Sequence, residues 1–592
     1  GRDAKCLGGF LGDGQNITMV GSDRTGEYVF INKDELKIKM NLILDDKETY
    51  RKTRTNPIKA LQKDIDKYTK KLIKYNYYKK PEISSMIEKN PILPRMYPLI
   101  KMHKEGNPIR PIVDCTSSIF KKLEYTLYKD PLKILSQDNK YDIKNSYEAK
   151  NNIKNINITN EQIIVSYDVV SLYPSIPLDL IYTLLNKNWE KLKNHTRIQS
   201  KSIFLEGIKL ICENTFFTYN DAIYRQKTGL PMGGSLSTSL AGIVMNYILD
   251  SSITETKIAP MLINKYIDDI LIVLNKKDNE ILFQKINNIH PKIKVTLEIE
   301  KNNEINFLDM TLNSNGTKIT TKFFKKITTA NTYLNYMTNH PKHIIHNSAK
   351  NLIHRAISLT DPQFYNEIKN KVNHILTENA YPSKLIQKNW SQALLQKNTS
   401  EHNSNNETVH LNTNTTETGL SQKYFALTYI PDITKNITRI FQKFNINEIK
   451  YTSTMNNKIK SFLPPLKDKI TAQHQTGIVY CLNCECGKKY VGHTKNFLNT
   501  RIDQHIKSLS SKSQTETSLM KHHRLTNHNF DFNNPSILDK ERNTNKRKLL
   551  EAIHIAANLD KLINDRKECS QVLRYDGALN QIKQFINITK TD

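Results

Sequence analysis

The stretch "NKYIDDILIVL", residues 264–274, places two adjacent carboxylates, Asp268 and Asp269, directly before a run of apolar residues that favour β-strands. Two like charges side by side are costly, because each carboxylate disfavours ionisation of the other. A bare Asp-Asp pair is most often the exposed turn of a hairpin, so the pair alone predicts no chemistry. It becomes a candidate metal site when a third carboxylate can join it.

A third carboxylate, Asp168, stands at the end of another β-rich run, "IIVSYDVVSLYPSIP" (163–177). A sheet can present side chains rigidly at its edge, and carboxylate oxygens are the ligands that Mg²⁺ prefers. Two such ions are the standard device for in-line phosphoryl transfer, one activating the attacking hydroxyl and one steadying the leaving pyrophosphate. The three aspartates are therefore candidate ligands of two magnesium ions at a site of phosphoryl transfer.

The order of the motifs resembles that of the reverse transcriptases, with "SYDVVSLYPSIP" as the first catalytic motif and "YIDD" as the second carboxylate motif. The resemblance implies that Asp168, Asp268 and Asp269 are catalytic metal ligands, and we rank Asp268 above Asp269 as a direct ligand. Tyr173 falls where the family places a bulky side chain against the 2′ position of the sugar. Such a side chain excludes ribonucleotides by steric conflict.

Two further stretches resemble the nucleotide-binding parts of that family. "LIKMHKEGNPIRPIVDC" has the pattern of a fingers hairpin, in which Lys101 and Arg110 could face the triphosphate; ordinary surface charges are the alternative. "QKTGLPMGGSLSTSLAGIVMN" (226–246) contributes Gln226 and Gly229, which the resemblance places at the nucleotide. Its glycines would let the backbone approach the template base closely, although the stretch is also typical of a loop that leads into a helix.

A second group of candidate catalytic residues lies in "GIVYCLNCECGKKYVGHTKNFLNTRIDQHI" and further downstream. A nuclease needs an activator for the attacking water, a cation for the transition-state charge and a carboxylate that holds a metal. Tyr480, Tyr490 and His505 could serve the first need. Arg501 could serve the second and Glu551 the third, whereas each residue alone could equally be structural.

Together these residues resemble the GIY-YIG endonuclease family, which uses one divalent metal. The two motifs stand here as Gly-Ile-Val-Tyr and Tyr-Val-Gly, which are conservative departures from the family pattern. The resemblance implies that Tyr480, Tyr490, Arg501 and His505 are catalytic and that Glu551 holds Mg²⁺. Asn564 is a weaker match, because its spacing from the other residues is free.

A structural metal site is predicted in the same region, where three of the seven cysteines lie within six residues. Cys-x-Cys together with His-x₅-His supplies four ligands for a tetrahedral Zn²⁺, which would staple the small domain rather than catalyse. The predicted ligands are Cys484, Cys486, His522 and His528. Cys481 or His523 could replace one of them, and a set of unligated residues is the alternative.

The whole chain has 592 residues and a formal net charge of +29, which favours a polyanionic partner such as nucleic acid. A coding bias toward Lys, Asn and Ile would produce a similar charge without such a partner. The sequence has no run of 18 or more apolar residues and no signal-peptide pattern, so we expect a soluble, intracellular protein without a membrane partner.

We predict a multidomain α+β protein: a right-hand core of fingers, palm and thumb, a helical N-terminal segment, and a small α/β nuclease domain with a zinc site. The Asn/Thr-rich part cannot bury enough apolar surface to fold and is predicted to be a linker or loop. The predicted boundaries are 1–90 for the N-terminal helical extension, 91–330 for fingers and palm, 331–395 for the helical thumb, 396–422 for the linker, 423–475 for a basic connector and 476–592 for the endonuclease.

The strings "LPRMYPLIKMHKEG", "SLYPSIP", "FLDMTL" and "YLNYMTNHPKH" closely resemble Penelope-like retroelements. This resemblance implies an RNA-directed DNA polymerase that nicks a target DNA duplex and extends the 3′-hydroxyl with dNTPs on element RNA, in the nucleus. The RNA, the DNA target and the oligomeric state stay open. An intron-encoded or telomerase-like reverse transcriptase is one alternative. A domesticated nucleic-acid-binding relic is another, disfavoured because the candidate catalytic residues of both constellations are intact.

Overall fold

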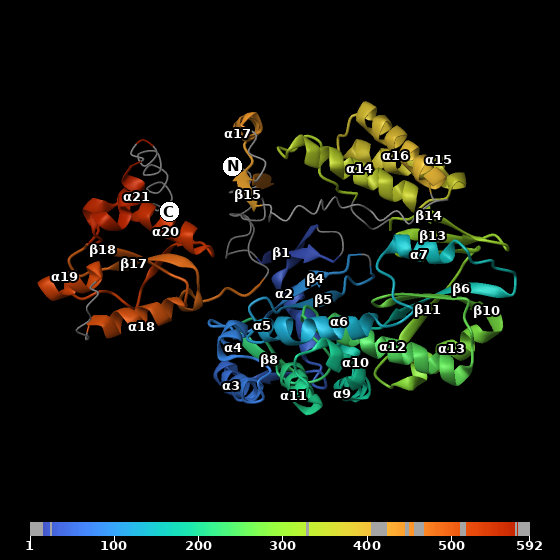
Figure 1. Cartoon of the computed structure of the whole chain (residues 1–592), viewed down its shortest axis with the longest axis horizontal. Coiled ribbons are helices and arrows are strands. Elements are labelled where there is room, and N and C mark those ends of the chain that lie inside the picture. Colours follow the sequence, from blue (N-terminus) through green and yellow to red (C-terminus); the bar gives the residue numbers. More distant parts are fainter. Residues whose placement is uncertain are drawn as a thin grey trace. The chain divides into compact units, whose positions relative to one another are not determined.

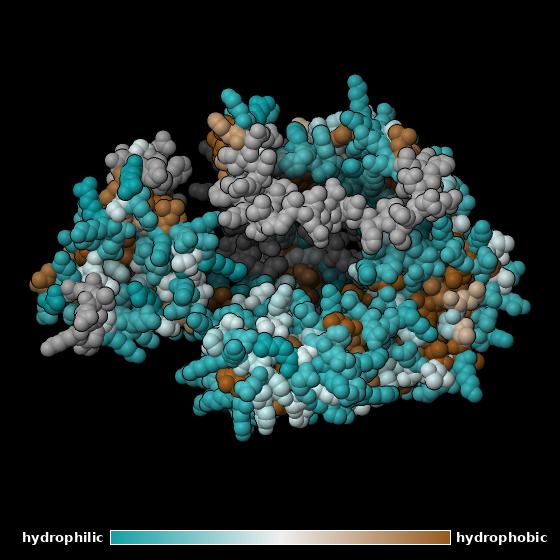
Figure 2. Space-filling model, viewed as in Figure 1, coloured by the Kyte–Doolittle hydropathy of each residue, from teal (hydrophilic) through white to brown (hydrophobic). Residues whose placement is uncertain are grey.

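The computed structural model divides into two compact units. Figure 1 shows its helices and strands, coloured along the sequence. The described residues are 16–23, 27–102, 104–326, 331–403, 423–444, 449–454, 467–509, 517–574 and 577. The first unit comprises 1–55, 96–114 and 124–466, and the second comprises 56–95, 115–123 and 467–592. Among the described residues, no helix is both long and apolar enough to cross a membrane. The face seen in Figure 2 is mainly hydrophilic, with apolar residues in smaller patches.

The first unit is built around a four-stranded antiparallel sheet in the order β11-β6-β10-β9. Its strands are β6 (Gln162–Val169), β9 (Leu262–Tyr266), β10 (Asp269–Asn275) and β11 (Val295–Ile299). The run from Ile270 to Leu274 is buried at every position, which explains why this strand is continuously apolar instead of alternating. Helices α12 (Ser237–Thr256) and α13 (Lys276–Ile289) pack together, and α13 contacts β10 and β11.

A second sheet of seven strands shows that the N-terminal segment is not only helical. Its order is β2-β1-β4-β7-β8-β3, with β5 paired to β4. The strands are β1 (Ile17–Ser22), β2 (Tyr28–Asn32), β3 (Tyr50–Thr53), β4 (Arg95–Ile100), β5 (Ile109–Asp114), β7 (Thr215–Tyr219) and β8 (Ala222–Gln226). The predicted helices are present as α2 (Lys33–Leu44), α3 (Ile58–Lys74) and α4 (Lys80–Met86). The prediction of a purely helical segment is wrong, because strands this short carry little periodic signal beside lysine-rich helices.

Three helices follow a third sheet, β12-β13-β14, and share one apolar core with it. The elements are β12 (Glu304–Phe307), β13 (Met310–Ser314), β14 (Ile319–Phe323), α14 (Lys342–Ser358), α15 (Tyr365–Glu378) and α16 (Ser383–Asn403). Phe307 and Met310 of the sheet lie in the same buried cluster as Leu352, Val372 and Trp390 of the helices. Because α16 continues to Asn403, the predicted linker begins within a helix; its remainder, 404–422, lies outside the described residues.

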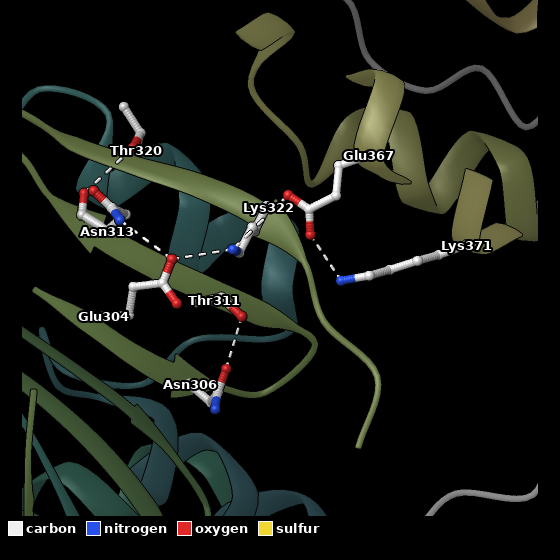
Figure 3. A network of polar contacts seen from close by, with 8 residues as sticks. All are labelled: Glu304, Asn306, Thr311, Asn313, Thr320, Lys322, Glu367 and Lys371. Carbon is white, nitrogen blue, oxygen red and sulfur yellow. Dashed lines mark hydrogen bonds and ion pairs between the residues drawn. The ribbon is translucent and has the colours of Figure 1, made fainter. Parts of the chain in front are cut away.

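A polar network also joins this sheet to α15 (Figure 3). Glu304 accepts hydrogen bonds from Lys322 at 3.0 Å and from Asn313 at 3.3 Å, and the Lys322 bond is the main cause that lowers the pKa of this carboxyl. Lys322 also lies 3.9 Å from Glu367 on α15, which pairs with Lys371 at 2.8 Å. The sheet and the helices are therefore joined by charges as well as by apolar contacts.

The segment predicted as a basic connector contains regular structure. Strands β15 (Lys423–Thr428) and β16 (Ile449–Thr454) pair in parallel, and α17 (Pro431–Lys443) connects them. This is a small βαβ unit, the usual way to join two parallel strands. Residues 455–466 of the predicted connector lie outside the described part of the chain.

The C-terminal part of the second unit is a three-stranded antiparallel sheet with helices on both faces. The sheet has the order β18-β17-β19, with β17 (Ile478–Asn483), β18 (Lys489–Thr494) and β19 (Ser536–Lys540). Tyr480 and Leu482 face a core shared with α18 (Leu498–Leu509) and α19 (Ser518–Thr526). Val479 and Cys481 face the opposite core, shared with α20 (Thr544–Ala557). This alternation follows from the two-residue period of a strand.

Candidate catalytic and metal sites

The register of the first sheet brings two of the three predicted aspartates together. Asp168 on β6 and Asp269 on β10 are direct cross-strand partners, so their side chains share one face of the sheet. Asp268 lies in the tight turn between β9 and β10, where its carbonyl accepts a hydrogen bond from the Val169 N–H at 3.3 Å. The sequence ranked Asp268 first, whereas the register makes Asp269 the partner of Asp168.

The turn itself carries a feature that the sequence did not indicate. Ile267, which precedes the aspartate pair, has φ of +59°, a conformation that a β-branched residue rarely adopts. Strain of this kind, of about 1–3 kcal/mol, persists where the surroundings enforce it and is often found at functional sites. The two adjacent carboxylates are thus held by a turn whose backbone is not at its preferred minimum.

The three aspartates fit a hard cation such as Mg²⁺, because all of them offer carboxylate oxygens and none is fully buried. Asp268 and Asp269 are consecutive in the sequence, and Asp168 lies opposite Asp269 on the neighbouring strand. Their oxygens are not drawn together as closely as those of a formed metal-binding group. Within the described ranges, the only group of three or more potential ligands with all atoms within 4.8 Å of one another is the Cys/His group of the second unit.

The glycine-rich loop after β8 lies against two neighbouring segments, and two of its glycines are required there. Gly229 has φ of +71°, and a Cβ on it would stand 2.2 Å from the carbonyl oxygen of Pro174. Gly233 has φ of +118°, and its Cβ would stand 2.3 Å from the carbonyl oxygen of Val113 on β5. Both positions therefore exclude a side chain by conformation and by space.

Backbone hydrogen bonds hold the same loop beside Tyr173. The Leu230 N–H donates to the Tyr173 carbonyl at 2.8 Å, and the Tyr173 hydroxyl lies 3.3 Å from the Thr238 hydroxyl. Gln226 is buried and donates to the Thr228 carbonyl at 2.9 Å. This bond shapes the turn, so Gln226 supports the loop here instead of pointing outward as an exposed nucleotide contact would.

The predicted fingers hairpin is present as β4 and β5, closed by the Lys101 N–H, which donates to the Pro108 carbonyl at 2.9 Å. Arg110 lies on β5, and its Nη1 is 3.2 Å from Oδ1 of Asp23, a buried carboxylate at the end of β1. Arg110 thus has an acidic partner that sequence reasoning missed. No local signal could have found it, because the two residues are 87 positions apart.

The second constellation assembles on one face of the β18-β17-β19 sheet. The Tyr480 hydroxyl lies 2.7 Å from Nε2 of His505, and the Nε of Arg501 donates to the same hydroxyl at 3.3 Å. Tyr490 lies edge-on to the His505 ring, with ring centroids 5.5 Å apart. Gly492 makes room for this arrangement, because a Cβ there would stand 2.8 Å from the Tyr480 hydroxyl. Four predicted nuclease residues are therefore brought together.

Burial controls the protonation states in this group. Burial, with a smaller contribution from the Arg501 charge, lowers the pKa of His505 to about 4. Burial raises the pKa of Tyr480 to about 12 and also raises the pKa of Tyr490. At neutral pH the imidazole is therefore neutral and the phenol is protonated. In the tautomer that carries its proton on Nδ1, His505 accepts the hydrogen bond of the Tyr480 hydroxyl at Nε2. A phenol that points at a neutral base has a path for transferring its proton.

Glu551 lies on α20, which shares the opposite core of the sheet, and its charge contributes to the raised pKa values of both tyrosines. Its Oε2 lies 2.5 Å from Nδ1 of His493, the residue after Tyr-Val-Gly. Sequence reasoning missed His493, although its position directly after the second motif was a signal. Asn564 is buried and bonds with both Nδ2 and Oδ1 to the backbone of Val491, so it fastens the edge strand β18.

The predicted zinc quartet is assembled in the second unit. All four candidate ligand atoms of Cys484, Cys486, His522 and His528 lie within 4.8 Å of one another. His522 Nε2 is 3.4 Å and 3.5 Å from the two sulfurs and 3.3 Å from His528 Nδ1. A tetrahedral zinc has edges of about 3.5 Å between S and N and about 3.3 Å between two N atoms. The arrangement therefore has the dimensions of a zinc site.

The two alternative ligands lie outside the quartet. The Cys481 sulfur approaches the Leu482 carbonyl, and the His523 ring is 2.7 Å from the His528 carbonyl through Nδ1. Backbone bonds also hold the quartet: the Glu485 N–H donates to the Asn529 carbonyl at 3.1 Å. This bond links the Cys-x-Cys turn to the residue that follows His528.

Three family models match the chain. They are "Reverse transcriptase (RNA-dependent DNA polymerase)" over residues 102–326, "Animal helix-turn-helix domain" over 332–391 and "GIY-YIG catalytic domain" over 476–549. The chain carries a reverse transcriptase domain and a GIY-YIG nuclease domain. It is therefore an enzyme with the domains of an RNA-directed DNA polymerase and of an endonuclease. No curated protein matches the chain.

Solved polymerase structures share only a weak likeness with this chain. Telomerase from Candida albicans, in complex with a fragment of telomeric RNA, is 11% identical, with 67% of this chain and 74% of that chain covered and a TM-score of 0.39. Apo telomerase from Candida tropicalis is 12% identical, with 64% and 65% covered and a TM-score of 0.38. The Sicinivirus RNA-dependent RNA polymerase is 13% identical, with 54% and 72% covered and a TM-score of 0.32. Likeness at this level carries no argument about function.

Proposed function

We propose that this chain is the protein of a Penelope-like retrotransposon, which nicks target DNA and extends the released 3′-hydroxyl by reverse transcription of element RNA. The observation that carries the proposal is the presence of two separate candidate catalytic groups in one chain. The cross-strand pair Asp168 and Asp269 is one, and the Tyr480–His505–Arg501 group is the other. A nick supplies the primer end that a polymerase needs, which gives the two activities a chemical reason to be joined. Chromosomal target DNA places this work in the nucleus.

In the polymerase site, Asp168, Asp268 and Asp269 are the residues that would hold Mg²⁺. The ions would supply activation of the primer 3′-hydroxyl and neutralisation of charge on the leaving pyrophosphate. Arg110 offers a fork of donors to the triphosphate, and Tyr173 stands against the 2′ position of the sugar. The loop with Gly229 lies against Pro174, and its Leu230 N–H donates to the Tyr173 carbonyl, which supports a role of this loop at the same nucleotide site.

In the nuclease site, Tyr480 and His505 form the proton path. Neutral His505 accepts the Tyr480 proton as the phenol oxygen takes a proton from the attacking water. Arg501 donates to the same hydroxyl and lies where it can stabilise negative charge that develops on the phosphate. Glu551 would hold the divalent cation, which supplies charge stabilisation at the scissile phosphate when bound.

We further propose structural roles for the remaining parts. The helices of 331–395 act as the thumb, since they share the core of the β12-β13-β14 sheet. A zinc ion on the Cys484, Cys486, His522 and His528 quartet staples the nuclease domain within 476–592.

Two single substitutions test the two-site proposal. Asp168→Asn should abolish DNA synthesis and leave nicking intact, because it removes one carboxylate charge with little change in shape. Glu551→Ala should abolish nicking and leave extension of a supplied primer intact. The protein is incubated with element RNA, supercoiled DNA, dNTPs and Mg²⁺, and nicked and extended products are separated. Loss of both activities from either change, in protein that still folds, contradicts the two-site proposal.

Coupling of the two activities is tested with the same variants. The Glu551→Ala protein should regain cDNA synthesis when the target duplex already carries a nick. The new strand should then be covalently joined to the nicked strand, as a sequencing read across the junction would show. cDNA that starts only from free oligonucleotides, never from the nick, would contradict target-primed synthesis and would favour an enzyme that extends existing ends.

A further inference from the structure

His493 is the closest described partner of the Glu551 carboxylate. Its Nδ1 lies 2.5 Å from Glu551 Oε2, and both side chains are mostly buried, with exposed fractions of 26% and 19%. An ionised carboxylate can only accept a hydrogen bond, so the Nδ1 of His493 carries the proton in this contact. Strand β18 supplies His493 directly after Gly492, at the edge of the sheet.

The rest of α20 is fixed to the opposite edge strand, β19, and to the segment that follows it. Arg547, almost completely buried, donates from Nη1 to the Glu541 carbonyl at 2.7 Å. One turn beyond Glu551, His554 Nε2 contacts Asp539 on β19. Arg547, Glu551 and His554 follow at intervals of four and three residues, so they share one face of the helix. The backbone of Glu551 is therefore held firmly, and His493 is the described contact that restrains its carboxylate.

We propose that His493 is a positioning residue of the nuclease site, which holds one oxygen of Glu551 so that the other oxygen is presented to the divalent cation. A carboxylate that turns freely would offer either oxygen and would spend part of its time facing away from the ion. Outer partners of this kind orient metal ligands, and their loss typically lowers metal affinity about 10–100-fold. The assignment of Glu551 as the metal-holding carboxylate comes from the proposed function, on which this inference rests.

Metal affinity, measured without any DNA, tests the proposal directly. The full-length chain is loaded with zinc, and Asp168→Asn, Asp268→Asn and Asp269→Asn remove the carboxylates of the polymerase site. Binding of Mn²⁺ to this parent is followed by the electron paramagnetic resonance of the free ion. The comparison adds His493→Ala, His493→Asn or Glu551→Ala, with circular dichroism and zinc content as checks on folding. Asn retains an N–H near the position of the histidine Nδ1, whereas Ala removes it.

We expect His493→Ala to weaken Mn²⁺ binding about 10-fold or more, His493→Asn to retain most of the affinity, and Glu551→Ala to abolish the site. Unchanged affinity in His493→Ala, while Glu551→Ala loses the ion, overturns the role of His493 and leaves the proposed function intact. An equal loss of Mn²⁺ affinity in His493→Ala and His493→Asn also overturns the role of His493, because the loss would then not be due to the missing hydrogen bond. Unchanged binding in Glu551→Ala instead overturns the metal assignment of the proposed function.

Discussion

On the proposal that a zinc ion staples the nuclease domain, replacing Cys486 with Ala should release this ion and unfold the part of the domain that it holds. Cys486 lies at the surface, so the substitution removes a ligand without opening a cavity in a core. Structural zinc contributes about 10–16 kcal/mol to the folding of small domains. That range is as large as the whole stability of a typical domain, about 5–15 kcal/mol. The backbone bonds between Glu485 and Asn529 are too few to replace a contribution of this size.

Two measurements follow the loss. Elemental analysis of the purified full-length chain should give one zinc per wild-type molecule and none in Cys486→Ala. Limited proteolysis should cut the variant between residues 517 and 530, where the wild-type protein is protected by α19 and the chain that follows it. DNA synthesis on a supplied primer should persist, because no predicted polymerase residue lies in this region.

Cys481→Ala and His523→Ala are the matched controls, because both residues neighbour the quartet without belonging to it. Each control should keep one zinc per chain. Retention of the zinc in Cys486→Ala would refute the reasoning, and so would its loss in His523→Ala alone. A wild-type protein that takes up no zinc, although all four residues are reduced, would show that the assembled side chains do not bind this ion.

The candidate sites give three further predictions. Because the pKa of buried His505 is lowered to about 4, the nicking rate should stay level between about pH 5 and 7, and a decline centred near the ordinary histidine value of about 6.5 would contradict this. Between pH 4 and pH 6.5 the His505 side chain is protonated in the unfolded chain but not in the folded one. The contribution of His505 should therefore lower the free energy of unfolding of its domain by about 3 kcal/mol from pH 7 to pH 4. Denaturant titration of wild type and His505→Asn at the two pH values would measure this difference. Gly233→Ala should abolish primer extension but not nicking, because its Cβ would stand 2.3 Å from the Val113 carbonyl. Gly106→Ala, also at positive φ but with nothing within 4 Å, should cost only about 1 kcal/mol and keep activity.

Local spacing in the sequence predicted the chemistry of both sites. The zinc quartet was predicted because Cys-x-Cys and His-x₅-His each fix two ligands within one turn or one helix end. Arg501 and His505 were predicted to share one helix face because they are four residues apart, whereas Tyr480 was assigned from the resemblance to the GIY-YIG family. Each of these spacings covers fewer than about ten residues. Sequence patterns are most informative over such short stretches, because one helix or strand then fixes the relative positions of the residues.

Features that depend on distant partners could not be predicted. The pairing of Asp168 with Asp269 requires the register between β6 and β10, which no single strand specifies. The contact of Arg110 with Asp23 and that of His493 with Glu551 join different elements that are far apart in the sequence, so local spacing could not pair them. The positive φ of Ile267 is also invisible in sequence, since a β-branched residue argues against that conformation.

The common core of the β12-β13-β14 sheet and helices α14 to α16 limits how this chain can be divided. The reverse transcriptase match ends at residue 326 and the helix-turn-helix match begins at 332, yet the apolar cluster crosses that boundary. A cut at this boundary would expose Phe307 and Met310 to water in the N-terminal fragment. It would also expose Leu352 and Trp390 in the C-terminal fragment. Exchange of the helical segment with that of another protein would therefore succeed only when both halves of the contact are transferred together.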